Sequence, residues 1–386
     1  MNVNKLRQKN LLLFEDLIFT VKCSLGRFTS LISFIRNQKT YVAAKSYFPE
    51  QELKSKRRIF YEQFLHILKH GETNEYYFLF GRDRKDTPRS RYLSRQKFIH
   101  LRDKVNLIPP KSENEYKIYN FVCLLQDKFT FGAFCRGNGV KTPVNIAIIE
   151  NGLLNLFEKK AIVPLEELEN LNIDTFCKLV TGDQGKGLFH LKISEKTIFM
   201  DGKPVTIQEL RQVLGQDKWI VQEKIADQHE EINKLYQHSI NTIRIMTVNT
   251  GSSVEVLGAV LRMGTDGRKI DNWSAGGIIV AIDFEKSELT KWGYYKPGYG
   301  TKVDAHPDTK VKFEQFKIPF IEEVVKEVKY LHSLLYGIHS IGWDVAITKD
   351  GPLFIEGNDN WGVTIFQLIH GESKQAFQKY LKIKSA

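Results

Sequence analysis

Three oxygen-bearing side chains near the end of the chain have the types and spacing of a site for a hard cation. Asp344, Glu356 and Asn358 lie in the run GWDVAITKDGPLFIEGNDNWG. Apolar segments at 343–347 and 353–356 flank a Lys-Asp-Gly-Pro turn, which predicts an antiparallel hairpin. In that hairpin Asp344 can face Glu356, while Glu356 and Asn358 share a face because strand side chains alternate. Since Mg²⁺ prefers carboxylate oxygens and nucleotide phosphates, the hairpin predicts a magnesium–nucleotide site.

A glycine-rich turn lies between two strand-like runs in FCKLVTGDQGKGLFHLKI. Gly182, Gly185 and Gly187 would let backbone N–H groups approach phosphate oxygens, and Lys178 and Lys186 would add positive charge. The segment is neither a Walker A sequence nor a dinucleotide fingerprint, because a strand-like run replaces the helix that both require. Taken alone, it is also compatible with a plain hairpin turn.

The run VQEKI at 221–225 is a strand pattern interrupted by Gln222, Glu223 and Lys224. An adenine pocket uses the backbone groups of an exposed strand edge, and Glu223 could accept the exocyclic amine. A strand with a solvated face is the alternative.

Two arginines, Arg244 and Arg262, interrupt consecutive apolar strand-like runs. An arginine buried there needs an anionic partner. Asn272 follows in DNWSAGG, together with the flexible pair Gly276-Gly277. These residues suit a transferring phosphoryl group and the oxyanion formed after it. Structural salt bridges are the competing explanation for the arginines.

The elements that must position these residues alternate along the chain. Helices are expected over 10–37 and 50–70, a short strand or helix end at 75–81, and a break at 108–110. Further helices are expected at 114–125 and up to 137 or 139. Strand-like runs follow at 144–150, 176–180, 188–193, 219–225, 241–248 and 254–263. An apolar stripe from Ile318 to Leu335 predicts one long helix with Gly337 as its C-cap. Antiparallel strands interleaved with helices indicate an α+β fold.

The charge of the chain is uneven. The net charge is +11, and residues 1–110 hold 22 Lys/Arg against 10 Asp/Glu. An anionic membrane, an anionic substrate or a solvated basic face would explain the surplus. Nucleic acid is not expected as a partner, because no zinc finger or RNA-binding signature is present.

The expected cellular environment follows from the cysteines and the N-terminus. Four scattered cysteines show no metal-ligand spacing. The apolar run LLLFEDLIFTV, interrupted by Glu15 and Asp16, is expected to be too short to span a bilayer, so a reducing, cytoplasmic location is expected.

In order, these segments resemble the ATP-grasp superfamily, and in particular its sugar-transfer-associated branch. The motifs are DKFTFGAFCRGNGVKTP (127–143), FCKLVTGDQGKG, IVQEKI, SINTIRIMTV, RMGTDGRKIDNWSAGG and the hairpin run, within residues 75–365. The resemblance implies an ATP-grasp fold of two α+β subdomains, at 111–225 and 226–386. A basic, mainly helical region would precede them at 1–110.

The resemblance also implies roles for individual residues. Lys128 and Lys178 would contact ATP phosphates, and 182–187 would form the lid loop. Gln222, Glu223, Lys224 and Ile225 would form the adenine hinge. Asp344, Glu356 and Asn358 would hold two Mg²⁺ ions, or Mn²⁺ in their place. Arg244 and Arg262 would steady the phosphoryl group and the acyl-phosphate, and Asn272 would orient the acceptor.

One position departs from the pattern of the superfamily. Several of its amino-acid ligases place an arginine two residues before the first metal aspartate, where this chain has Gly342. Stabilisation of the oxyanion would then fall on Arg244 or Arg262.

The function implied is an ATP- and Mg-dependent ligase that joins a small-molecule carboxylate to an amine or thiol through an acyl-phosphate. The acceptor would be sugar-linked, in the synthesis of a cell-surface polysaccharide, and the protein would contact the inner membrane face peripherally. A kinase acting on a sugar or polyol hydroxyl is the alternative. A non-catalytic protein with a basic binding surface is a third hypothesis.

Overall fold

The structure is a computed structural model that describes residues 3–87, 92–106, 121–182, 187–225, 227–335 and 337–370. Its α-helices are α1 Val3–Arg36, α2 Gln38–Tyr41, α3 Lys56–His70, α4 Arg95–Asn106, α5 Cys123–Gln126, α6 Lys128–Gly137, α7 Ile207–Leu214, α8 Glu230–Leu235, α9 Ile321–Leu334 and α10 Val363–His370. Two short 3₁₀ helices are η1 Leu165–Asn170 and η2 Trp273–Ala275.

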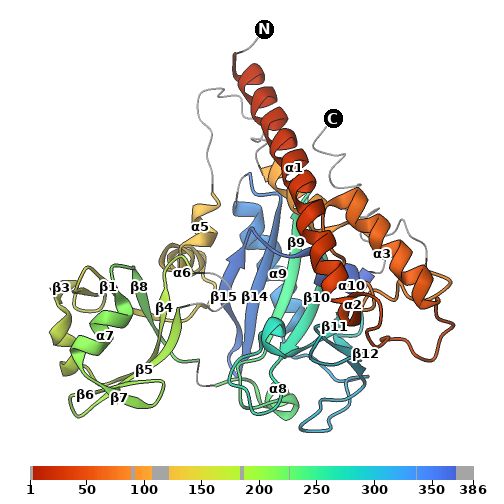
Figure 1. Cartoon of the computed structure of the whole chain (residues 1–386). Helices are drawn as coiled ribbons and strands as arrows, with labels where there is room; N and C mark the ends of the chain where they lie inside the picture. The colour runs from red at the N-terminus through yellow and green to blue at the C-terminus, as the bar shows by residue number, and fades with distance from the viewer. Residues whose placement is uncertain are drawn as a thin grey trace.

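The strands form two antiparallel sheets, in separate lobes of the molecule (Figure 1). The first lobe contains β1 Asn145–Glu150, β2 Leu153–Leu156, β3 Ala161–Pro164, β4 Ile173–Leu179, β5 Leu188–Ser194, β6 Thr197–Met200, β7 Lys203–Val205 and β8 Trp219–Glu223, in the order β3-β2-β1-β8-β4-β5-β6-β7. The second contains β9 Thr242–Asn249, β10 Val254–Met263, β11 Ile278–Asp283, β12 Glu288–Tyr295, β13 Lys302–Val303, β14 Ser340–Thr348 and β15 Gly351–Asn358, in the order β13-β12-β11-β10-β9-β14-β15.

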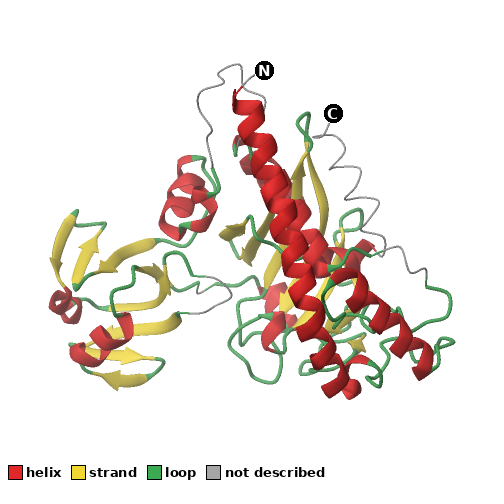
Figure 2. Ribbon diagram, turned by 45° about the horizontal axis from the view of Figure 1, so that its top comes forward, coloured by secondary structure: helices red, strands yellow, loops and turns green. Residues whose placement is uncertain are grey.

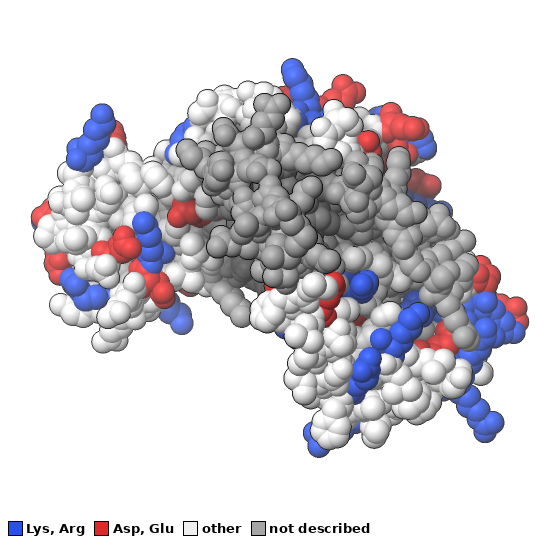
Figure 3. Space-filling model, turned by 90° about the horizontal axis from the view of Figure 1, so that it is seen from above, with Lys and Arg blue, Asp and Glu red and all other residues white. Residues whose placement is uncertain are grey.

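The first lobe buries one side of its sheet beneath α7. This helix starts with a capping box, in which Thr206 and Glu209 satisfy each other's backbone N–H groups. Its buried side chains Leu210 and Leu214 join the core formed by the alternate residues of β1, β4, β5 and β8. On the face of this lobe turned to the viewer in Figure 3, basic and acidic side chains are interspersed.

The second sheet is covered on both faces. On one face, Ile243 and Ile245 of β9 pack in a core with α9, α5 and α6. On the other face, Val260 and Ile279 pack against N-terminal residues such as Phe80, and Met246 packs near α4 and α10. Because strand side chains alternate, each strand contributes to both layers.

The N-terminal region therefore packs on the second sheet. Its longest helix, α1, crosses in front of that sheet (Figures 1 and 2) and packs on α3 and α4. By length and composition, the segment Leu13–Arg36 is long and apolar enough to cross a membrane. The prediction that this apolar run is too short was wrong, because the helix continues through residues 22–36.

Most of the expected elements are present, and the α+β prediction is confirmed. The segment 75–81 is a series of turns, so the prediction of a strand or helix end there was wrong. Most of the helix expected over 114–125 lies outside the described residues. Helix α9 ends at Leu334 with Leu335 as its C-cap, two residues before Gly337. The division of the ATP-grasp part at residue 225 stays a prediction, and α5 and α6 pack with the second sheet.

Candidate functional site

Four neighbouring strands of the second sheet present polar side chains on one face. The predicted hairpin is confirmed as β14 and β15, with Asp344 opposite Glu356 in its register. On its other side, β14 pairs with β9, which places Asp344 opposite Arg244. Strand β10 completes the group with Arg262, opposite Thr242 of β9. The sheet order thus brings together residues that are up to 114 positions apart in the sequence.

Asp344 is the most strongly paired member of this group. Its carboxylate accepts two hydrogen bonds from the Arg244 guanidinium, one of them 2.7 Å long at Oδ2, and Arg262 Nη2 lies 3.0 Å from the same Oδ2. Burial alone would raise the pKa of Asp344, but the charges of the two arginines outweigh burial and hold that pKa well below its usual range. Both predicted catalytic arginines therefore pair with the predicted metal ligand.

A second carboxylate, Asp271, completes the pairing of Arg262 and was not predicted from the sequence. Its Oδ2 lies 3.5 Å from Arg262 Nε and accepts a hydrogen bond from the Thr242 backbone at 3.0 Å. Thr242 Oγ1 in turn accepts from Arg262 Nη2 at 2.6 Å. The sequence signal was an aspartate directly before Asn272. The Asn272 side chain accepts from Ser274 N at 2.9 Å and thereby caps η2.

Glu356 and Asn358 lie on the same face of β15, as predicted. Asn358 Nδ2 donates to Glu356 Oε1 at 3.1 Å. Burial, and then the negative charge of Asp344, raise the pKa of the Glu356 carboxyl. A divalent cation would offset the repulsion between these two carboxylates, so the residues present fit a magnesium ion. Within the described residues, no group of three or more His, Cys, Asp or Glu side chains could hold a metal. Ligands beyond the two carboxylates would thus be Asn358 and phosphates.

Two lysines face this group across a cavity. Lys128 is the first residue of α6, and its Nζ donates to the Gly182 carbonyl at 2.6 Å, where the glycine-rich turn begins. Lys178 lies half-buried on β4, and burial lowers its pKa to about 8. Both lysines line the same cavity as Gly182 and Gly187. Gly185 and Lys186 lie outside the described residues.

Only two of the four residues of the predicted adenine hinge line the cavity. Glu223 and Ile225 line the cavity beside apolar side chains that include Phe176 and Leu188. The Gln222 side chain is instead buried, and its Nε2 donates to Asn145 Oδ1 on the neighbouring strand β1 at 2.7 Å. Lys224 is exposed, with its Nζ 3.8 Å from Asp174 Oδ2. Neither of these two side chains lines the cavity.

The cavity has a volume of about 690 Å³ and continues beyond the paired charges. This outer half is built by the N-terminal region, the start of α10 and the loop before η2. Its lining is mainly cationic and aromatic with one carboxylate, Glu75, and was not predicted from the sequence: Tyr76, Arg95, Phe98, Arg102, Lys269, Lys296 and Trp361. No sequence signal links these residues, since they come from five separate segments.

Trp361 accounts for the glycine at position 342. A Cβ atom on Gly342 would lie 2.8 Å from Trp361 Cβ, so no larger residue fits without a shift. The indole Nε1 donates to Ser340 Oγ at 3.1 Å, and the Trp361 carbonyl accepts from Arg102 Nη1 at 3.1 Å. The Trp361 side chain thus restricts position 342 to glycine, and Arg102 of α4 holds the Trp361 backbone.

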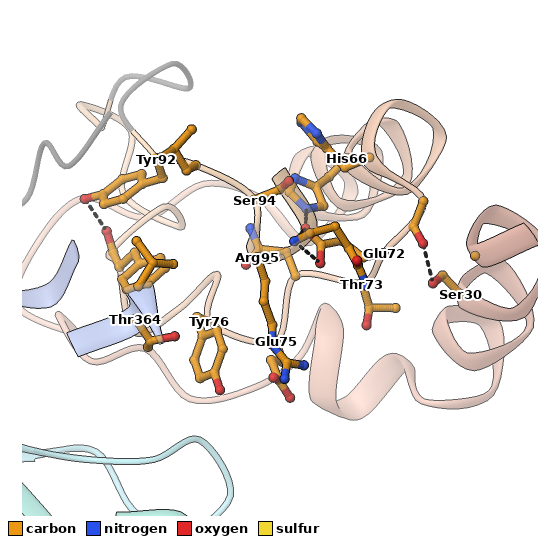
Figure 4. A pocket seen from close by; sticks show the side chains of 18 of the residues that line it. Ser30, His66, Glu72, Thr73, Glu75, Tyr76, Tyr92, Ser94, Arg95 and Thr364 are labelled. Atoms are coloured by element: carbon orange, nitrogen blue, oxygen red, sulfur yellow. Dashed lines mark hydrogen bonds and ion pairs between the residues drawn. The ribbon is translucent and has the colours of Figure 1, made fainter. Parts of the chain in front are cut away.

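A smaller polar cavity lies behind this outer half, between α1, α3 and α10 (Figure 4). Tyr76, Arg95 and Thr364 line both cavities and form the wall between them. Its central carboxylate, Glu72, accepts from Gln96 N at 3.1 Å, and burial raises the pKa of Glu72. Burial lowers the pKa of the neighbouring His66 to about 3, so its imidazole is neutral at pH 7.

Comparisons with solved structures find similar but distant proteins. A D-alanine–D-alanine ligase from Bacillus anthracis is 12% identical (TM-score 0.38) over 69% of this chain and 66% of that one. An L-amino acid ligase from Bacillus licheniformis is 16% identical (TM-score 0.38) over 68% and 49%. The biotin carboxylase domain of the 2-oxoglutarate carboxylase from Hydrogenobacter thermophilus is 13% identical (TM-score 0.40) over 69% and 46%. The chain thus spans less than two thirds of the length of these proteins.

No curated protein matches the sequence significantly. The family described as sugar-transfer associated ATP-grasp matches residues 111–381, which is well over half of the chain. The resemblance predicted from the motifs is confirmed, and the chain belongs to the sugar-transfer associated ATP-grasp family.

Proposed function

We propose that the protein is an ATP- and Mg-dependent ligase that joins a carboxylate to an amine, or to a thiol, through an acyl-phosphate. The observation that carries this proposal is the row Arg262, Arg244, Asp344 and Glu356 on adjacent strands, which lines one cavity with Lys128 and Lys178. Cations on two sides of the cavity and two adjacent carboxylates suit the triphosphate of Mg-ATP.

In this proposal Lys128 and Lys178 bind the phosphates, and Glu223 with the backbone of 224–225 holds the adenine. Asp344, Glu356 and Asn358 would hold magnesium, one ion or two, or manganese, which would supply positive charge for the phosphates. Gly182 and Gly187 flank the loop that would cover the phosphates. Gly185 and Lys186, which belong to that loop, would contact the phosphates.

The reaction would proceed in two steps. A substrate carboxylate oxygen attacks the γ-phosphorus, the bond to the β-phosphate oxygen breaks, and ADP leaves. The amine then attacks the acyl carbon, phosphate leaves, and the amine loses a proton. Arg262 and Arg244 would stabilise negative charge in both steps, because guanidinium groups suit phosphoryl and acyl oxyanions. Asn272 would orient the acceptor from the opposite side of the cavity.

The outer half of the cavity would bind the carboxylate and the acceptor. Both cavity arginines of the sheet already pair with carboxylates, so an anionic substrate needs further cations. Arg95, Lys269 and Lys296 line that half together with aromatic rings. The aromatic faces suit a sugar-linked acceptor, and the family description agrees with such an acceptor.

Trapping with hydroxylamine tests the proposal. Purified protein is incubated with Mg-ATP, hydroxylamine and a panel of small carboxylates, and both ADP and acyl hydroxamate are quantified. We expect one class of acid to give both products in equal amounts. Formation of ADP without hydroxamate for every competent substrate would overturn the acyl-phosphate step. A stable phosphorylated sugar or polyol would instead identify a kinase.

We also propose that the protein works in the cytoplasm, in polysaccharide synthesis, in peripheral contact with an anionic membrane. The surplus of Lys and Arg over residues 1–110 supports that contact.

A further inference from the structure

The outer face of α1 exposes a continuous apolar stripe. Its side chains repeat every three or four residues, so they lie on one side of the helix. They are Leu13, Phe14, Leu17, Val21, Leu25, Phe28, Ile32 and Ile35. Phe28 is 71% exposed and Leu25 is 69% exposed, and the stripe runs for about 33 Å at 1.5 Å per residue. Large exposed apolar surfaces of this kind mark interaction sites.

The opposite face of α1 is fixed to the protein. Cys23 and Phe34 are buried, and Gly26 packs so closely on Gly71 that a Cβ atom on Gly26 would lie 2.3 Å from the Gly71 carbonyl oxygen. Arg27 Nε also donates to the Leu68 carbonyl at 2.8 Å. A helix that spans a bilayer would have to give up these contacts. The stripe is therefore suited to lying along a surface, with the body of the protein behind it.

The neighbouring helix α3 also exposes apolar side chains, and its exposed charges are positive. Phe60, Tyr61, Leu65 and Leu68 are exposed, and the Phe60 ring lies 5.0 Å from that of Phe34 on the inner face of α1. The exposed charged residues of α3 are all basic: Lys56, Arg57, Arg58 and Lys69. The acidic residue of this helix, Glu62, is buried and lies 3.0 Å from Lys54.

We infer that this α1–α3 surface docks on an anionic lipid bilayer and inserts its apolar side chains at the boundary between headgroups and acyl chains. An amphipathic helix with basic residues beside its apolar face binds lipid in this way. Charge complementarity favours lipid over a second copy of the chain, because pairing two copies would bring the basic residues of both α3 helices together. The inference deepens the proposed membrane contact by naming its surface, and it does not depend on the ligase chemistry.

Flotation with lipid vesicles tests this docking surface. The full chain is mixed, without nucleotide, with vesicles of phosphatidylcholine alone or with one third phosphatidylglycerol. We expect flotation with the anionic vesicles, and we expect the double variant Leu25→Glu/Phe28→Glu to bind at least about tenfold more weakly. The matched control is the double variant Leu153→Glu/Ile162→Glu, which places the same two charges at residues that are 49% and 67% exposed in the first lobe. It should bind like the unchanged chain.

Several results would overturn the inference. They are equal flotation of the Leu25→Glu/Phe28→Glu variant and the unchanged chain, no flotation of the unchanged chain, and a dimer by light scattering that this variant abolishes. Circular dichroism and ADP binding of each variant separate lost docking from lost folding. A kinase, or a protein without turnover, would leave the flotation result unchanged, so failure of the proposed chemistry is distinguishable. Resistance to alkaline carbonate extraction would indicate a spanning helix and would also contradict docking.

Discussion

The two faces of the second sheet use the same strands for opposite purposes. Ile243 and Ile245 of β9 are fully buried against α9, while Arg244 between them faces the cavity. Strand β14 repeats this division with Trp343 in the core and Asp344 in the ion-pair group. The comparison shows how a rigid apolar layer can hold charged groups in place. The cavity face pays an electrostatic cost for this, since paired charges are taken out of water.

If the two faces of the sheet have independent roles, changes on the cavity face should alter turnover and changes on the core face should alter stability. The following experiments test that separation, from the largest effect to the smallest.

Replacing Glu356 by glutamine should have the largest effect. The change keeps the size of the side chain but removes a carboxylate that the proposed site needs, so turnover should fall by about a thousandfold. Unfolding by urea should be almost unchanged, because burial already disfavours the charged form of Glu356. The control Glu314→Gln removes an exposed carboxylate 4.0 Å from Lys291. Full turnover of Glu356→Gln would contradict the assignment of Glu356 as a magnesium ligand.

Replacing Trp343 by alanine probes the core face. The indole is fully buried, and its Nε1 donates to Thr247 Oγ1 at 2.8 Å. The free energy of unfolding should fall by about 3–5 kcal/mol, measured by urea denaturation. ADP should still bind to the folded fraction with little change in affinity. A large loss of affinity at unchanged stability would show that the two faces are not separable.

The contact between Gly342 of β14 and Trp361 tests how the cavity lining depends on close packing. Gly342→Ala should cost about 1–3 kcal/mol because its Cβ atom overlaps with the indole side chain. Trp361→Gly, which removes the Cβ atom that the new methyl group would meet, should also destabilise the protein, but the double variant should lose less than the sum of the two changes. Strictly additive losses would mean that Trp361 is not what restricts position 342.

The pH dependence of nucleotide binding should show the smallest effect. A lysine binds phosphate in its charged form, which is present below its pKa. Because burial lowers the pKa of Lys178 to about 8, ADP affinity without magnesium should fall a few-fold as the pH rises through this value. Lys178→Arg should remove the effect, since arginine stays charged. Calorimetry between pH 6 and 10 measures both, and a profile that persists in Lys178→Arg would contradict the assignment.

Much of the cavity face was predictable because it depends on local rules. The turn before Gly351 and the two-residue alternation of strands predicted the pairing of Asp344 with Glu356. The same alternation indicated that Arg244 and Arg262 interrupt buried strands and need anionic partners.

The rest depends on contacts between distant segments, which no local pattern encodes. Asp271 reaches Arg262 only through a loop that folds back on β10, and Trp361 meets Arg102 across 259 residues. The short strands β2, β3, β6 and β7 were not predicted either, because runs of three or four residues carry little periodicity.

The packing of the N-terminal region has a practical consequence for choosing a minimal protein. The family match begins at residue 111, yet Val260 and Ile279 of the sheet share a core with Tyr77, Phe78 and Phe80. A chain truncated to the matched residues would leave that sheet face bare and lose Arg95 and Arg102 from the cavity. We therefore expect the smallest unit that folds to be longer than the unit that sequence comparison recognises.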